Sequence, residues 1–543
     1  MGALRKRWRA LRDTAGRFFS GIETRQVLLR AAGRALLGIF LIWLNPFDLF
    51  HKADEASSNA FQVFVTPFIH HTVADPGVTV ILFTASSLKN IREAMEDDTW
   101  TWPLSFDQQA KILHRIVTKD YKPLAIFYDI EFYQPRGNPE NFRKALSATT
   151  GVDAKWDCND FHNDVPLTPV LMAAPPDPET IFKDLCGAGV QAVNVNWSGR
   201  PNVYPLAGIQ ESKSDHHAMV SPAAALFMYA CFRRQQFFPY ENCFFRSTAD
   251  FAGHDPANLV WRSDYGTGDI VQQEKFQTFF LSECDYSGWF DANGAWPRLI
   301  RFLRSVFSRK ASSRGEETIT TCPAPVVIGA DQIFLHPKDN SALIAALQNR
   351  VVLIGADLPG LRDRVATPFH GMVPGVFAHA TAFDNLAERG EHYISASRDE
   401  SFFNANRVLQ FLVVWLALCA TVLTVEHLTK RLPPLATLAY ERKPAWRDFR
   451  AALVTFLDIF ALAALTALGL LLLSIVFFFG LHEAPLDWIG ELAIVWLIAF
   501  DEIVAALGRA LAVFPLRFDP VRAAARHFLE HPKENPNHAA PHD

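Results

Sequence analysis

Long apolar segments constrain this chain more than any other feature of its sequence. Residues 408–425 form a run without a charged side chain, and residues 451–480 carry Asp458 as their one charge. Residues 488–514 are apolar apart from a few ionisable side chains. Each segment is long enough to cross a bilayer as an α-helix, in which all backbone hydrogen bonds are made within the segment. The sequence therefore predicts three membrane spans in this part of the chain.

A fourth apolar segment, residues 33–50, lies near the N-terminus. It contains Arg34, Pro46 and Asp48, so its uninterrupted apolar core is short. Two interpretations are open, a membrane span and a cleaved signal peptide. We favour the span because a long Arg-rich leader precedes the segment and no small-residue cleavage pattern follows it.

Basic side chains set the expected orientation, since they concentrate on the cytoplasmic side of a membrane. They cluster before the first span and between the second and third: Arg5, Lys6, Arg7, Arg9, Arg12, Arg17, Arg25 and Arg30, then Lys430, Arg431, Arg442, Lys443, Arg447 and Arg450. The connection 481–487 has neither Lys nor Arg. We expect a multi-pass protein of the bacterial inner membrane. Its N-terminus 1–32, loop 426–450 and tail 515–543 are then cytoplasmic, and residues 51–407 form one large domain outside.

Short apolar runs predict a parallel sheet in this outer domain. Residues 77–83 and 124–132 are typical of buried strands, and residues 106–119 between them have helical spacing. A strand, helix and strand within this distance form a βαβ unit. The pattern recurs later, with a helix at 340–349, a strand at 350–356 and a segment 373–388 that turns at Pro374 and Gly375 into a helix. The expected fold class is an α/β domain, with a mixed, largely parallel sheet and flanking helices, plus a four-helix transmembrane region.

Six cysteines lie in the expected outer domain: Cys158, Cys186, Cys231, Cys243, Cys284 and Cys322. In an oxidising compartment they could form three disulfides, whose pairing the sequence does not define. Free buried thiols are the alternative. No CxxC pair or Cys/His spacing indicates zinc.

Catalytic and cofactor motifs are not found. The run "VVLIGADLPG" starts like a phosphate-binding turn but lacks both the GxGxxG order and the Lys of GxxxxGK[ST], so Gly355 is interpreted as a strand-to-loop turn. Neither GxSxG, HExxH nor a kinase motif occurs. The adjacent histidines of "SDHH", residues 214–217, would lie on a loop, point apart and chelate a metal poorly. We expect no enzyme, no cofactor, no metal and no nucleic-acid partner.

Several segments, taken in order, resemble the CHASE2 extracellular sensor family. The matching residues include Trp102, Pro103, Asp129, Gly355, Ala356, Asp363, Thr367, Pro368, Pro374, Gly375, Val376, His379, Ala380, Asn385 and Leu386. The resemblance implies a bacterial membrane receptor with an N-terminal span, an outer CHASE2 domain and three further spans.

Four of the matching residues are candidates for ligand contact: Asp129, Asp363, Thr367 and His379. Loops at the carboxyl ends of strands commonly bind ligands in open α/β sheets. The alternative for the loop around Asp363 is a structural salt bridge, and for Asp129 a turn or cap hydrogen bond.

The chain departs from the family pattern at two places. Thr84 and Ala85 stand where relatives tend to carry an acidic pair, which removes two potential ligands. Receptors of this family usually continue into a cyclase, kinase or cyclic-di-nucleotide module, whereas about 30 residues follow the fourth expected span here, too few to bury a catalytic core. The output is therefore expected to pass to a separate effector protein.

The expected spans contain an unusual set of charges: Asp458, Glu491, Asp501, Glu502 and Arg509. Glu491, Glu502 and Arg509 fall near one helix face, and charges in a span should face protein or water rather than lipid. A polar seam between helices is the favoured interpretation, and a proton or cation relay is the other.

The sequence as a whole predicts a membrane sensor that binds an unknown extracytoplasmic ligand, contacts membrane lipid and signals to a partner. A homo-oligomer is compatible with this. A structural or scaffold subunit of a membrane assembly is the alternative, and a proton- or cation-coupled component is a weaker one. An open polar pocket at the sheet ends would favour the sensor, and a sealed one the scaffold.

Overall fold

The computed structural model divides the chain into two compact units, of which residues 58–398 with 477–485 form the second. The residues described are 58, 59, 61, 62, 77–118, 120–130, 136–152, 167–174, 185–195, 202–211, 216–233, 243, 251, 254–261, 325–336, 340–361, 363–368, 371–396 and scattered positions in 464–475. All four expected spans therefore lie wholly or almost wholly outside this part of the chain, as does the five-residue charged set within them. Among the described residues, no helix is long and apolar enough to cross a membrane.

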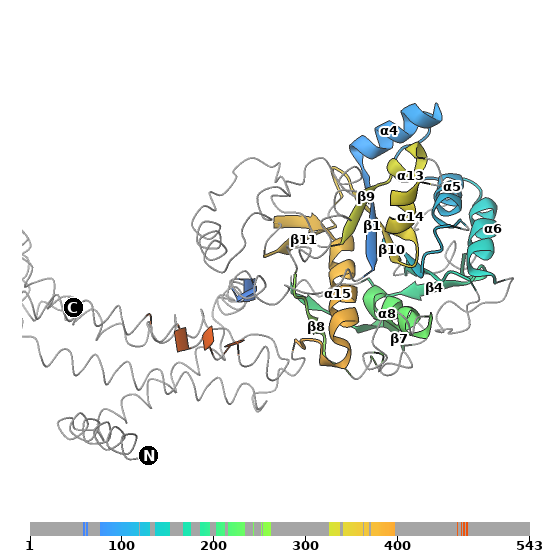
Figure 1. Ribbon diagram of the computed structural model, residues 1–543. Coiled ribbons are helices and arrows are strands. Elements are labelled where there is room, and N and C mark those ends of the chain that lie inside the picture. Colours follow the sequence, from blue (N-terminus) through green and yellow to red (C-terminus); the bar gives the residue numbers. More distant parts are fainter. Residues whose placement is uncertain are drawn as a thin grey trace, which may run out of the picture. The chain divides into compact units, whose positions relative to one another are not determined.

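A six-stranded sheet forms the centre of the second unit, in the order β4-β3-β2-β10-β1-β9 (Figure 1). Every neighbouring pair in it is parallel. Its strands are β1 Val78–Thr84, β2 Ala125–Tyr128, β3 Val170–Ala173, β4 Val190–Val193, β9 Val326–Gly329 and β10 Val351–Asp357. Their side chains are buried almost throughout, which is why they read as continuous apolar runs. The prediction of an α/β domain with a largely parallel sheet is confirmed.

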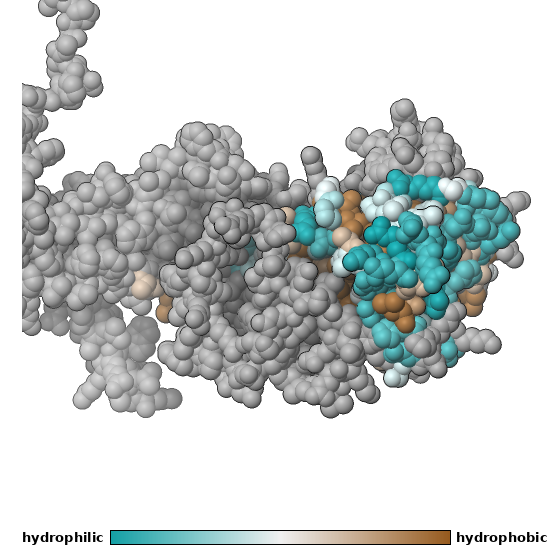
Figure 2. All heavy atoms as spheres, turned by 90° about the horizontal axis from the view of Figure 1, so that it is seen from above, coloured by the Kyte–Doolittle hydropathy of each residue, from teal (hydrophilic) through white to brown (hydrophobic). Residues whose placement is uncertain are grey.

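Helices cover both faces of the sheet and enclose two apolar cores (Figure 1). One face carries α4 Ala85–Met95, α5 Phe106–Ile116, α6 Pro139–Thr150, α13 Gln332–Leu335 and α14 Ser341–Leu347. The other face carries α8 Pro222–Arg233 and α15 Val376–Arg389, and α15 runs into the short 3-10 helix η4 Gly390–His392. In the view of Figure 2 the described surface is mostly hydrophilic, as expected for a layer whose apolar side faces the sheet.

Local side-chain hydrogen bonds fix where the first helices begin. The Thr84 hydroxyl accepts the Ser87 N–H at 3.0 Å while the Ser87 hydroxyl accepts the Thr84 N–H at 2.8 Å. Ser105 and Gln108 form the same reciprocal capping box at the start of α5. Such boxes satisfy backbone N–H groups that the first turn leaves unpaired. Thr84 and Ala85, the departure from the family's acidic pair, are thus the cap and the first residue of α4.

The long β10 lies between β1 and β2, so the sheet takes strands from both ends of the domain, as predicted. Its register runs from Val78 opposite Val351 to Thr84 opposite Asp357. The predicted strands at 77–83 and 350–356 are correct within one residue. The predicted strand at 124–132 is too long, because regular pairing ends at Tyr128.

Among the described residues, three short antiparallel pairs lie outside the main sheet: β5 Val203–Tyr204 with β8 Ala257–Asn258, β6 Ala207–Glu211 with β7 His216–Val220, and β11 Arg364–Thr367 with β12 Gly371–Pro374. The expected loop position of "SDHH" is wrong for its histidines, because His216 and His217 begin β7 and pair with Glu211 and Gln210. The helix predicted after the turn at Pro374 and Gly375 is confirmed: β12 ends at Pro374, Gly375 is the N-cap, and α15 begins at Val376.

The interpretation of Gly355 as a strand-to-loop turn is also wrong. β10 continues through it to Asp357. A Cβ at Gly355 would lie 2.7 Å from the Cβ of Val376, closer than packed side chains allow. This glycine therefore permits close approach of the first residue of α15 to the strand.

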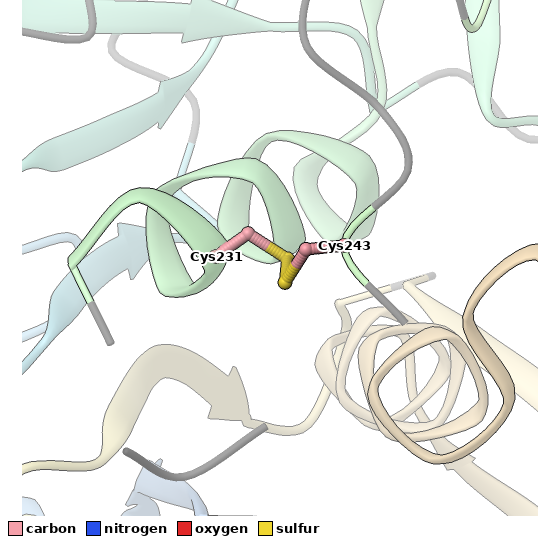
Figure 3. Close-up of a disulfide and its surroundings, with 2 residues drawn as sticks. All are labelled: Cys231 and Cys243. Atoms are coloured by element: carbon pink, nitrogen blue, oxygen red, sulfur yellow. A yellow bond between two sulfur atoms is a disulfide. The ribbon is translucent and has the colours of Figure 1, made fainter. Parts of the chain in front are cut away.

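A disulfide joins Cys231 in α8 to Cys243, with Cα atoms 5.6 Å apart (Figure 3). Cys186 is disulfide-bonded as well. The prediction of disulfides is confirmed for these three cysteines, and for the others it stays a prediction. Such bonds persist in oxidising compartments.

Candidate functional site

The direction taken by the chain after each strand defines a crevice at the carboxyl edge of the sheet. The helices that follow β1, β2 and β9 all pack on the α5 face, whereas α15, which follows β10, packs on the opposite face. Neighbouring strands whose connections leave on opposite faces form the topological switch point of an open α/β sheet, where ligands commonly bind. The ends of β2 and β10 meet at such a point.

Asp129 stands at this point, directly after β2. Its backbone N–H donates to the Ile354 carbonyl of β10 at 2.8 Å, which fixes its position on the neighbouring strand. Side chains alternate along a strand, so Asp129 shares the side of Phe127, which belongs to the core beneath α15. Its side chain is 10% exposed.

His379 is the residue that meets Asp129. It lies one turn into α15, with its Nε2 atom 3.7 Å from Asp129 Oδ1 and its Nδ1 atom 2.7 Å from the Tyr204 hydroxyl. The imidazole packs edge-on against Phe127, with ring centroids 5.2 Å apart. The Nε2 to Oδ1 distance is too long for a direct hydrogen bond. Asp129, His379 and Tyr204 therefore form a buried polar group that joins β2, α15 and β5, and we call it the buried triad.

Burial determines the charge state of this group. It lowers the pKa of His379 to about 3, so the imidazole is neutral at pH 7. Burial likewise raises the pKa of the Tyr204 hydroxyl above its ordinary value. That hydroxyl accepts the Ala223 N–H at 3.3 Å, so it can donate its own hydrogen to His379 Nδ1. The imidazole hydrogen is then on Nε2, facing Asp129.

Asp363 lies near the same end of α15. Its carbonyl accepts the Gly375 N–H at 3.1 Å. A Cβ at Gly375 would be 2.7 Å from the Asp363 Cγ, so the carboxylate rests against the backbone at the start of α15. Gly375 precedes His379 by one helical turn. A carboxylate at a helix N-terminus is stabilised by the helix dipole, which accounts for Asp363 structurally.

Thr367 is placed further away. It is buried at the end of β11 opposite Gly371, while Arg364 pairs with Pro374 at the other end of the hairpin. Three residues along a strand correspond to about 10 Å. Asp129 and His379 are therefore in contact, and Asp363 lies against Gly375, one helical turn before His379. Thr367 lies at the other end of the β11–β12 hairpin.

The remaining charged residues of this loop favour the salt-bridge interpretation. Arg364 forms an ion pair with Asp357 at the end of β10. Both side chains are partly exposed, so the pair adds little stability. Among the described residues, no cluster of three or more His, Cys, Asp or Glu side chains is placed to hold a metal.

A shallow hollow of about 440 Å³ lies elsewhere, on the face of the sheet opposite α15. Arg143, Lys144, Ser147, Ala148 and Gly151 line it. Arg143 and Lys144 both pair with Glu140 on the same helix, so the hollow is a helix surface rather than a prepared anion site.

Comparison with known families agrees with this architecture. A model of the CHASE2 domain matches residues 34–424, well over half of the chain. The chain belongs to the CHASE2 family. No curated protein and no solved structure matches it.

CHASE2 membership supports a sensor-type domain and confirms the resemblance seen in the sequence. Of the residues that matched the family pattern, Asp129 and His379 contact each other in the CHASE2 domain. Asn385 connects α15 to Val260. Sequence reasoning missed Tyr204, because "NVYPLAG" has neither a motif nor a periodicity that sets its tyrosine apart.

Proposed function

We propose that this CHASE2 protein is an integral membrane receptor whose CHASE2 domain lies outside the cytoplasm. The observation that carries the proposal is the extent of the family match, 34–424, which begins within the first apolar segment, 33–50, and ends within the second, 408–425. Disulfide bonding of Cys231 with Cys243 supports an oxidising compartment.

Topology is tested with reporter fusions to the full chain. Alkaline phosphatase, which is active only outside the cytoplasm, is inserted between residues 62 and 77, in 481–487, in 426–450 and after 515. We expect activity at the first two positions and none at the last two. Activity in 426–450 without activity between 62 and 77 would overturn the proposed orientation.

The signal acts, in this proposal, at the buried triad. Asp129 and His379 join the end of β2 to α15 at the switch point of the sheet, so a change in their contact displaces α15. Output then passes through the membrane helices to a separate effector that binds the basic loop 426–450.

A photocrosslinking amino acid placed in the basic loop tests this step in cells. Asp129→Asn should change which protein is captured, or how much, because it removes the charge facing His379. The control is Asp98→Asn, an exposed carboxylate before Trp100. Identical capture in Asp129→Asn, in Asp98→Asn and in the parent protein would refute signal transfer from the triad.

A scaffold subunit is the second candidate function, and burial of the triad favours it. Side chains of Asp129 and His379 are 10% and 6% exposed, which suits an internal polar contact more than an open ligand pocket. A scaffold predicts constant capture of one membrane partner in every variant that folds. A receptor predicts capture that depends on Asp129.

A further inference from the structure

The first and last described segments of the range 58–398 are hydrogen-bonded to one short stretch of chain. The N-terminal arm comprises the described residues of 58–62, and the C-terminal arm is 393–396. Residues 255–261, which include β8, lie against both and are called the bridging segment. The N-terminal arm starts eight residues after the apolar segment 33–50, and the C-terminal arm ends 12 residues before Val408, where the next one starts.

Gln62 connects the N-terminal arm to the bridging segment. Its side chain is buried, and its amide donates to the Leu259 carbonyl at 2.7 Å and accepts the Trp261 N–H at 3.2 Å. Two bonds to alternate residues are the pattern that a neighbouring strand would make. Phe61, the neighbour of Gln62 in the N-terminal arm, is fully buried as well.

Asn385 of α15 holds the opposite edge of the same segment. Its side-chain oxygen accepts the Val260 N–H at 3.1 Å, and its amide donates to the Val260 carbonyl at 3.1 Å. Asn385 is also buried, and it donates to the Thr381 carbonyl within α15 at 2.6 Å. Successive residues of an extended segment direct their backbone hydrogen-bonding groups to opposite edges. Gln62 bonds to Leu259 and Trp261 and Asn385 bonds to Val260, so the two side chains hydrogen-bond to opposite edges of the bridging segment.

The C-terminal arm pairs with the first half of the bridging segment. The Asn258 N–H donates to the Ile394 carbonyl at 2.7 Å, and the Ala396 N–H donates to the Pro256 carbonyl at 2.6 Å. The Tyr393 hydroxyl donates to the Asp255 carbonyl at 2.8 Å. Both arms and α15 are therefore attached to one stretch of seven residues.

We propose that the bridging segment is a clasp that makes the two arms and the C-terminal half of α15 move as one body. This inference rests on the proposed function, because it supplies the step between the buried triad and the membrane segments. His379 and Asn385 are six residues apart on α15, so they lie on different faces of the helix. One face carries His379 of the buried triad, and another carries Asn385, which bonds to the bridging segment. A shift of α15 therefore displaces both arms together.

Hydrogen exchange measured by mass spectrometry on the full chain in detergent micelles tests the clasp. Asn385→Leu removes the two bonds to Val260 without touching the N-terminal arm, and Gln62→Leu removes the two bonds on the other edge. Gln62→Leu loses two hydrogen bonds, which corresponds to about 30-fold faster opening. Asn385→Leu loses its two bonds to Val260 and also its bond to the Thr381 carbonyl, so its effect should be at least as large. We expect the acceleration in 255–261 and also in the arm that the substitution does not contact: 58–62 for Asn385→Leu, and 393–396 for Gln62→Leu.

Gln109→Leu is the matched control. It also replaces a buried amide by Leu, on α5 at the other face of the sheet, and should leave all three segments unchanged. Acceleration restricted to 255–261 in both test variants would overturn the clasp. If Asn385→Leu fails to fold, the exchange rate of 393–396 in Gln62→Leu is the deciding measurement. Hydrogen exchange within the domain does not depend on the orientation of the domain in the membrane. A failure of the clasp is therefore distinguishable from a failure of the proposed topology, which the reporter fusions test.

Discussion

Stability of the CHASE2 domain should depend on pH through His379. Its pKa is lowered by burial to about 3, against 6.5 for an exposed imidazole. Between these values the unfolded chain binds a proton that the folded chain does not, so stability decreases as pH falls from 6.5 towards 3. At pH 5 the expected loss relative to pH 8 is about 2 kcal/mol. The Asp129 carboxylate at 3.7 Å opposes the shift, so this value is the upper end.

His379→Asn isolates this contribution. Asparagine retains a side-chain oxygen near the position of Nδ1 for the Tyr204 hydroxyl, but it does not titrate. Urea unfolding followed by tryptophan fluorescence gives the unfolding free energy at pH 8 and pH 5 for the parent and the variant. The parent should lose up to about 2 kcal/mol more than His379→Asn over this range.

The matched control is His392→Asn, the same substitution at an exposed position of η4 outside the buried triad. All other titrating groups are common to the three proteins, so their contributions cancel in the comparison. Equal loss of stability in the parent and in His379→Asn would refute the inference that the folded domain holds this imidazole neutral.

Three further tests, on close packing, helix capping and the disulfide, use urea unfolding as the measurement. Gly355→Ala should destabilise by about 1–3 kcal/mol because its Cβ meets Val376, whereas Gly187→Ala, with open space, should change little. Thr84→Ala should cost about 1 kcal/mol by removing the α4 cap, and Thr84→Asp should cost nearly nothing since Asp caps equally well. Replacing Cys231 and Cys243 together by Ser should cost about 3 kcal/mol, given their separation of 12 residues, and an unchanged urea midpoint would contradict it.

The two seven-residue strands of the central sheet were predictable, as was the four-residue β2, but its other four-residue strands were not. β1 and β10 are continuous apolar runs bounded by polar residues, a pattern typical of buried parallel strands. β3, β4 and β9 consist of four residues each, "VLMA", "VQAV" and "VVIG". Runs this short also occur within buried helices, so periodicity does not distinguish them.

Glycine shows why motif reasoning failed at the end of β10. A glycine after an apolar strand is compatible with a turn, with a phosphate-binding loop and with close packing of a helix. The choice depends on Val376, which follows 21 positions later and reaches Gly355 only once β12 has returned the chain to the strand. Contacts between residues this far apart in the sequence cannot be predicted from a local motif. Asp129 and His379 were likewise predicted as separate candidates, and only the topology brought them together.

The surroundings of α15 limit how a signal can travel through the domain. Every residue from Val376 to Ala387 is buried, so the helix is enclosed around its whole circumference. A helix packed in this way does not bend locally without opening cavities, and it therefore moves as a rigid body or not at all. The triad contacts its first turns and Asn385 holds its later part. A displacement at the carboxyl edge of the sheet must consequently reach the bridging segment, whether a ligand or a neighbouring protein causes it.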